Sequence, residues 1–279
     1  MTTMMRIAIH SDFHHEFRNE LPPIKNTGSD VLVLAGDICV AHHLYRHPRD
    51  IIRNNAENGH KAALYREFFQ YCSDNWETVI MVAGNHEFYS GDWEKTIGIM
   101  REETQHYPNI LFCDQDRVDL GDVTFLGCSL WTNFNRGDPL TMMSMKDLMS
   151  DYHAITENPK EGIYHKLRPI TTFAKHNSDL DWLRIQLSLL KDRKVVVVTH
   201  HQPSFRSVHE KYKTQTIMNG AFCSNLDDFI MDNPQIKLWC SGHVHNTWDY
   251  MIGETQLITN PFGYPKENTG WDANLVVEV

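Results

Sequence analysis

Short runs of β-branched and other apolar residues recur along the whole chain. The most regular runs are Arg6–Ile9, Asp30–Ala35, Thr78–Val82, Val195–Thr199 and Ile236–Cys240. Runs of this length that end abruptly in polar residues or glycine predict buried strands. Further strands are predicted at Asn109–Phe112, Val123–Cys128, Glu254–Thr259 and Asn274–Val279.

Apolar residues at helical spacing lie between several of these runs. Two helices are predicted at Lys61–Trp76 and Asp92–Tyr107. A third is predicted to begin at a cap formed by Ser178 or Asp179 and to end near Lys191. A fourth is predicted to begin at Ser224–Asp227, which resembles a capping box, and to end at about Met231. Strands and helices together predict an α/β protein. Because strand runs extend from the first residues to the last, we expect residues 1–279 to form one domain.

Residues 132–169 differ from the rest of the chain. This stretch is polar, Met-rich and irregular, with one predicted helix at Leu140–Met149. Long irregular segments inside a regular fold are often functional. We expect 132–169 to be an insertion that lies over the site as a lid, with a solvent-exposed loop as the equally weighted alternative.

Chemically active side chains follow five of the predicted strands. They are Asp12 and His14, Asp37, Asn85 and His86, His200, and His243 and His245. A single Asn-His after glycine is compatible with an ordinary turn. Ligands of open α/β sheets, however, bind outside the carboxyl ends of the strands, so five such strand ends predict one shared site.

The same residue types indicate a metal centre. Carboxylate, imidazole and amide oxygen suit Mn, Fe or Zn. Alternate residues of an extended strand point the same way, so Asp12 and His14 can bind one ion. Seven ligands exceed what one zinc ion takes and suit two ions that share a bridging carboxylate, an arrangement that supports phosphoryl transfer.

Composition narrows the classes of partner and the compartment. Lys plus Arg is 26 and Asp plus Glu is 36, a formal net charge of −10. This balance argues against a nucleic-acid-binding surface, which needs a basic stripe. The six cysteines form no C-x-x-C pair. The first residues lack the apolar core of a signal peptide, and no apolar run reaches membrane-spanning length. We therefore expect a cytoplasmic protein without a membrane partner.

In chain order, Asp-x-His, Gly-Asp, Gly-Asn-His-Glu, His and Gly-His-x-His resemble the calcineurin-like metallophosphoesterase superfamily. The resemblance extends from Asp12 to His245 and is strongest to uncharacterised bacterial and phage-type members. It implies a four-layer α/β/β/α sandwich of two mixed sheets, with metal ligands on loops at one edge of the sheets.

The resemblance also implies roles for the predicted site residues. One metal ion would be held by Asp12, His14, Asp37 and His245, and the other by Asp37, Asn85, His200 and His243, with Asp37 bridging. His86 would contact the phosphate and assist the leaving group, while a hydroxide between the metals attacks phosphorus in line.

Departures from the family pattern bear on the substrate. Protein serine/threonine phosphatases of this superfamily have Gly-Asp-x-Val-Asp-Arg-Gly, whereas this chain has Val40 and Ala41 where they have Asp and Arg. Val40 cannot orient His86, and Ala41 cannot bind phosphate. We therefore predict a phosphodiesterase acting on a small phosphorylated substrate, with a phosphatase-like phosphomonoesterase or a non-catalytic scaffold as alternatives.

Other residues near the motifs receive no site role. We expect His201 to lie behind the predicted ligands and not to bind a metal ion itself. Tyr89 can stack on a substrate or form a hydrophobic wall, and Asn260–Tyr264 can be a pocket rim or only a turn.

Overall fold

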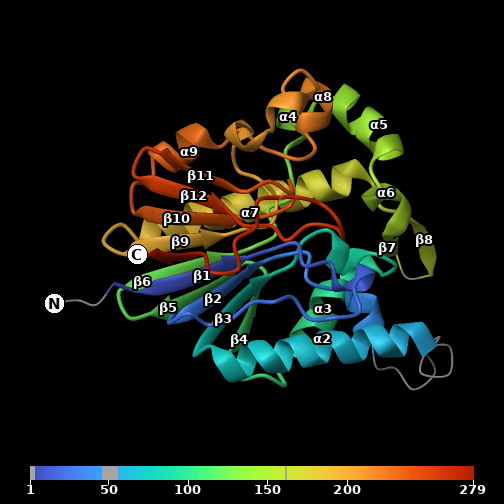
Figure 1. The fold of residues 1–279 in the computed structure, drawn as a ribbon. Helices are drawn as coiled ribbons and strands as arrows, with labels where there is room; N and C mark the ends of the chain where they lie inside the picture. Colours follow the sequence, from blue (N-terminus) through green and yellow to red (C-terminus); the bar gives the residue numbers. More distant parts are fainter. Residues whose placement is uncertain (1–3, 46–55, 161) are drawn as a thin grey trace.

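A computed structural model describes residues 4–45, 56–160 and 162–279 and contains two large sheets packed face to face (Figure 1). The first sheet has the order β13-β1-β2-β3-β4, formed by Val276–Glu278, Arg6–His10, Val31–Ala35, Thr78–Val82 and Ile110–Cys113. The second has the order β11-β12-β10-β9-β6-β5, formed by Trp248–Ile252, Thr255–Thr259, Ile236–Ser241, Lys194–Val198, Val123–Gly127 and Asp116–Leu120.

Both sheets are mixed. Strands β1 to β4 run parallel, and β13 joins β1 antiparallel. In the second sheet β6, β9, β10 and β12 are parallel, while β5 and β11 are antiparallel edges. Since the central strands are covered on both faces, nearly continuous apolar runs are what they require.

Helices cover the two outer faces. Helices α2 (Ala56–Asn75) and α3 (Trp93–Thr104) lie against the first sheet (Figure 1), where Phe68, Phe69 and Met100 join its core. The leucines of α7 (Pro169–Leu189), with α9 (Asp227–Met231), pack on the second sheet. A third apolar cluster fills the space between the sheets. The predicted four-layer α/β/β/α sandwich is therefore confirmed.

Two predicted helix starts are wrong. Helix α7 begins at Pro169, in the first turn where proline is favoured, so Ser178 and Asp179 lie inside it. Asp179 instead accepts hydrogen bonds from the Leu130 amide and the Lys175 amine. Ser224 does not cap α9, because its hydroxyl accepts the backbone N–H of Asn133.

The segment 132–169 carries most of its residues in short elements. They are α4 (Phe134–Gly137), α5 (Pro139–Leu148), α6 (Asp151–Ala154) and the hairpin of β7 (Thr156–Lys160) and β8 (Ile163–Lys166). The predicted helix at Leu140–Met149 corresponds to α5. Tyr152 and Ile155 of this segment are buried in the core of the first sheet. A role of the segment as a lid stays a prediction.

Short elements complete the described chain. They are the 3₁₀ turns η1 (His15–Phe17), η2 (Ala41–Leu44), η3 (His86–Phe88), η4 (Phe205–Ser207) and η5 (Glu210–Tyr212), and the helix α8 (Thr216–Asn219). Among the described residues, none of the helices is both long enough and apolar enough to span a bilayer.

Candidate metal centre

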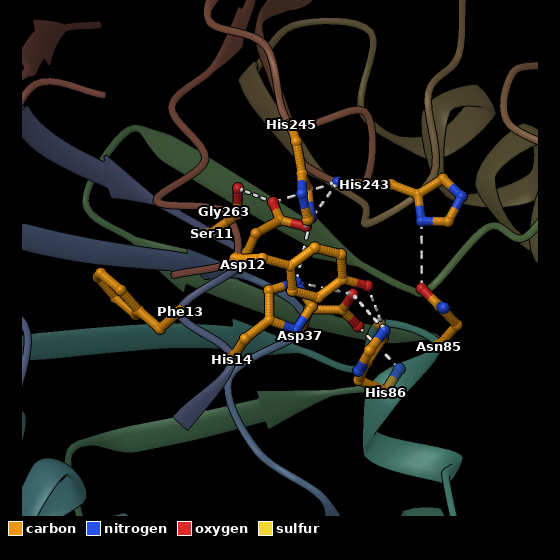
Figure 2. Close-up of polar contacts among 12 residues, drawn as sticks. Ser11, Asp12, Phe13, His14, Asp37, Asn85, His86, His243, His245 and Gly263 are labelled. Atoms are coloured by element: carbon orange, nitrogen blue, oxygen red, sulfur yellow. Dashed lines mark hydrogen bonds and ion pairs between the residues drawn. The ribbon is translucent and has the colours of Figure 1, made fainter. Parts of the chain in front are cut away.

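The seven predicted ligands converge at one edge of the two sheets. Figure 2 labels all of them except His200, whose Nε2 lies 3.1 Å from the Asn85 Oδ1. Strands β1, β2 and β3 deliver ligands from the first sheet, and β9 and β10 deliver them from the second. Five of the seven have positive φ angles: Asp12 (55°), His14 (47°), Asp37 (56°), His243 (71°) and His245 (45°). Non-glycine residues rarely adopt this conformation, and clusters of them are typical of functional sites.

The first ligand group contains Asp12, His14 and His245, whose donor atoms all lie within 4.8 Å of one another. The Nε2 atoms of His14 and His245 are 3.1 Å apart. Their Nδ1 atoms lie 3.1 Å from Glu16 and 2.7 Å from Glu267, respectively. When each Nδ1–H donates to its carboxylate, both Nε2 lone pairs face the same point, which is how histidines bind a cation.

The second group contains Asp37, His200 and His243, with Asn85 between the two histidines. The Asn85 Oδ1 lies 3.1 Å from His200 Nε2 and 3.1 Å from His243 Nδ1. The His200 Nδ1 lies 2.8 Å from the Ala35 carbonyl, which leaves Nε2 facing the site. Burial, together with the nearby His201 and His200, holds the pKa of His243 well below its ordinary value, so this ligand is neutral.

Asp37 lies between the two groups. Its Oδ2 is 3.7 Å from His14 Nε2 and 3.3 Å from His200 Nε2. Burial opposes ionisation of Asp37, but the surrounding imidazoles, His200 first, hold its pKa well below the ordinary value. Burial likewise lowers the pKa of His200, yet the Asp37 carboxylate outweighs it and raises that pKa to about 10. The cluster therefore favours positive charge, and its donor set fits two cations.

Glu87 and Gly84 fix the position of Asp37. The Glu87 carboxylate accepts four backbone N–H groups, those of Asp37, Ile38, Cys39 and Gly84. A Cβ at Gly84 would overlap the Asp37 side chain and lie 2.7 Å from its backbone nitrogen. Glu87 thus shapes the loop that presents the bridging carboxylate.

His86 lies beside the ligands and is held on three sides. Its Nδ1 is 2.7 Å from Glu16 Oε1, its Nε2 is 3.1 Å from the Tyr264 hydroxyl, and its ring stacks on Tyr89 at 4.1 Å (Figure 2 shows His86 next to Asp37). Burial lowers the pKa of His86, but Asp37 and Glu16 raise it to about 9. The imidazole therefore carries a proton at neutral pH.

Glu16 is the main functional residue that motif analysis missed. Its Oε1 contacts both His14 and His86, and the side chain is only 8% exposed. It supplies the orientation of His86 that Val40 cannot provide. Its position two residues after the Asp-x-His motif was the only signal in the sequence.

Residues without a predicted role divide into two groups. Tyr264 and Tyr89 contact His86 and line a cavity of about 390 Å³ that adjoins the predicted metal ligands. His201 packs between Trp131 and His243, behind the site, as expected for a residue that is not a ligand.

Comparisons with known proteins identify the family and the fold. A family model described as calcineurin-like phosphoesterase matches residues 5–247. An uncharacterised protein of Acanthamoeba polyphaga mimivirus, L509, is 25% identical over 230 residues, which cover 77% of this chain and 78% of the viral protein. The crystal structure of phosphopantetheinyl hydrolase from Mycobacterium tuberculosis has the same fold, with a TM-score of 0.64, 14% identity, and coverage of 100% of this chain and 97% of the hydrolase.

Proposed function

The chain is a member of the calcineurin-like phosphoesterase family of metal-dependent ester hydrolases, and we propose that it hydrolyses a phosphodiester with two metal ions. The observation that carries this proposal is the pair of ligand groups next to each other, with Asp37 between them and His86 beside them. In this proposal Asp12, His14, Asp37 and His245 hold one ion, and Asp37, Asn85, His200 and His243 hold the other. Manganese, iron and zinc all suit these donors.

Bound ions would supply Lewis-acid activation of the phosphate and of the attacking water. Asp37 fixes the spacing of the two ligand groups, and Glu87 fixes Asp37. Glu16 and Glu267 direct the Nε2 atoms of His14 and His245 into the site. The chain thereby places phosphate and nucleophile before the reaction begins, which is the main contribution of protein to phosphoryl transfer.

His86 is the proposed proton donor. Its Nε2 lies 4.0 Å from Asp37 Oδ2, so it faces the place where a phosphate would meet the metals. With Nδ1 held by Glu16, the Nε2–H, which here lies 3.1 Å from the Tyr264 hydroxyl, is the one that can protonate the departing oxygen and stabilise charge on the phosphate. The Tyr264 hydroxyl holds the ring from the same side and would give way to the substrate.

The lining of the adjoining cavity supports a diester over a monoester. A monoester dianion gains most from extra cations, such as the arginine that protein phosphatases carry. Among the described residues, neither lysine nor arginine lines the cavity, and Ala41 is buried. A diester carries one negative charge and needs room for a second arm, which the cavity provides. The phosphatase alternative therefore ranks second.

The test compares bis(4-nitrophenyl) phosphate with 4-nitrophenyl phosphate in Mn²⁺. Both release the same nitrophenolate, so a difference in kcat/KM reports the number of ester arms. We expect faster hydrolysis of the diester, and loss of both activities in Asp37→Asn. Preference for the monoester would favour the phosphatase alternative. No hydrolysis by protein that has bound its metals would favour the scaffold alternative.

The proposal includes a small phosphorylated substrate and neither membrane nor nucleic acid as a partner. It also places the protein in the cytoplasm, where free thiols are stable. All six cysteines are free and buried, which suits a reducing compartment.

A further inference from the structure

Part of the cavity beside the predicted metal ligands has an apolar lining, although the same cavity is also lined by polar side chains such as Ser150, Ser207, His209 and Asn219. We call this apolar part the apolar chamber and define it by Met145, Met149, Val208, Met218 and Phe222. Met145 and Met149 come from the segment 132–169, and the other three come from the stretch between η4 and α9. Each segment contacts the predicted metal ligands. From the stretch between η4 and α9, Phe222 stacks on His243 with ring centroids 5.1 Å apart. From the segment 132–169, Asp151 accepts a hydrogen bond from the Tyr89 hydroxyl, which in turn accepts one from Asn85.

Charge is scarce in the apolar chamber. Among the described residues that line the cavity, no side chain is a lysine or an arginine. Apart from the metal ligand Asp37, the one carboxyl group in the described lining is Asp151, which forms no ion pair with a lysine or arginine of the described chain. Apart from histidines, among them His86 at the metal edge and His209, the described lining offers no cation to a second phosphate or a carboxylate, so burying such a group here would cost hydration with little compensation.

Apolar surface is what the apolar chamber offers instead. Methionine adapts to irregular apolar shapes and makes favourable contacts with aromatic rings. Three methionines and Phe222 therefore form a wall that accepts an aryl or alkyl group beside the metals. The cavity volume of about 390 Å³ lies in the range of small-molecule sites.

Resting on the proposed function, we propose that the substrate is a phosphodiester with a single phosphate whose second arm is uncharged and apolar, and that the apolar chamber binds this arm. Nucleotide polyphosphates and diesters with a carboxylate on that arm are poor substrates. The segment 132–169 then sets specificity through Met145 and Met149. Its removal is no clean test, because Tyr152 and Ile155 belong to the core.

The experiment uses 4-nitrophenyl diesters that differ only in the second arm: methyl, phenyl and carboxyphenyl. All three release nitrophenolate, so chemistry is constant while the arm changes. Burial of a phenyl ring should raise kcat/KM on the order of 10- to 100-fold over methyl. The carboxyphenyl diester should not show this increase in kcat/KM over the methyl diester. Equal values for methyl and phenyl, or preference for carboxyphenyl, would overturn the proposal.

Two methionines of one stretch provide matched variants. Met149 is 8% exposed and lines the chamber, whereas Met143 is 70% exposed on α5. Met149→Ala should lower kcat/KM several-fold more for the phenyl diester than for the methyl diester, and Met143→Ala should change neither. Because Met149 belongs to the buried core, thermal unfolding and metal content of Met149→Ala report whether the fold and the metal centre are intact. A phenyl preference that survives Met149→Ala unchanged would place the arm elsewhere.

A binding measurement separates failure of this inference from failure of the proposed function. Calorimetry of the metal-loaded protein with phenylphosphonate and methylphosphonate needs no turnover. Tighter binding of phenylphosphonate, weakened by Met149→Ala, supports the apolar chamber even when no diester is hydrolysed. Equal binding of the two phosphonates overturns the chamber even when diesters are hydrolysed.

Discussion

Replacing Glu16 with glutamine tests whether one buried carboxylate orients the proton donor. Glu16 Oε1 lies 2.7 Å from His86 Nδ1 and 3.1 Å from His14 Nδ1. Burial raises the pKa of Glu16, but hydrogen bonds from His14 and His86 lower it to about 2, so the group is ionised. Glutamine keeps the shape and removes the charge.

The expected loss follows from the hydrogen bond that is weakened. A bond between charged groups contributes about 1.5–3 kcal/mol, which corresponds to roughly 10- to 150-fold in kcat when it acts in the transition state. Since Glu16 is 8% exposed, solvent screens it little. We expect that loss of kcat for substrates with poor leaving groups, little change in KM, and a smaller loss for nitrophenyl esters.

Glu267→Gln is the matched control. Glu267 Oε2 lies 2.7 Å from the Nδ1 of His245, also a predicted ligand, yet Glu267 does not contact His86 in the structure. Both variants thus lose a carboxylate behind a ligand histidine, and metal content measured in both reports that shared effect. If kcat falls equally in both, or if the loss in Glu16→Gln is independent of the leaving group, the orienting role of Glu16 is refuted.

Three further predictions concern catalysis, metal binding and acid stability. His86→Ala should lower kcat for poor leaving groups by about 10²–10⁴ with both metals still bound; equal losses across a leaving-group series would leave only an electrostatic role, and loss of a metal would make His86 a ligand. Gly84→Ala should displace Asp37 and reduce metal content, and full metal content would contradict the close fit between Gly84 and Asp37. As a control, Gly98→Ala has open space around the new methyl group and should stabilise α3 by about 0.5–1 kcal/mol. Burial lowers the pKa of His176 to about 4, below the value of 6.5 in the unfolded chain, so the unfolded state binds the proton first and stability falls as pH drops from about 6.5 to about 4. In that window His176→Asn should flatten the slope of unfolding free energy against pH by up to about 1.4 kcal/mol per pH unit, and denaturant titrations that show an unchanged slope would contradict this.

The parts of the fold that sequence predicted well are those determined locally. Buried parallel strands require continuous apolar runs, and Asp37 follows such a run directly. The edge strands β5 and β11 escaped detection because they alternate exposed and half-buried residues. The start of α7 was missed because polar residues that resemble caps, such as Asp179, serve buried contacts inside the helix.

The candidate site was likewise predicted only in its locally determined parts. The predicted ligands follow strands and are visible as motifs, and the structure brings them together, while their assignment to two ions comes from the resemblance to the family and stays a prediction. Two of the contacts that orient site histidines could not be read from the sequence, because Tyr264 and His86 are 178 residues apart and Glu267 and His245 are 22 apart. Such contacts depend on how loops fold over the sheet edge, and no periodicity encodes them. The apolar chamber likewise forms only when distant segments meet.

Titration of metal-free protein with Mn²⁺, followed by electron paramagnetic resonance, tests the central claim most directly. Two groups of ligands that share Asp37 should bind two ions per chain, and the shared carboxylate should couple their spins. Asp37→Asn should weaken both the binding and the coupling. The account predicts a stoichiometry of two with a spin-coupled signal at saturation. One ion per chain, or two ions without coupling, would contradict it.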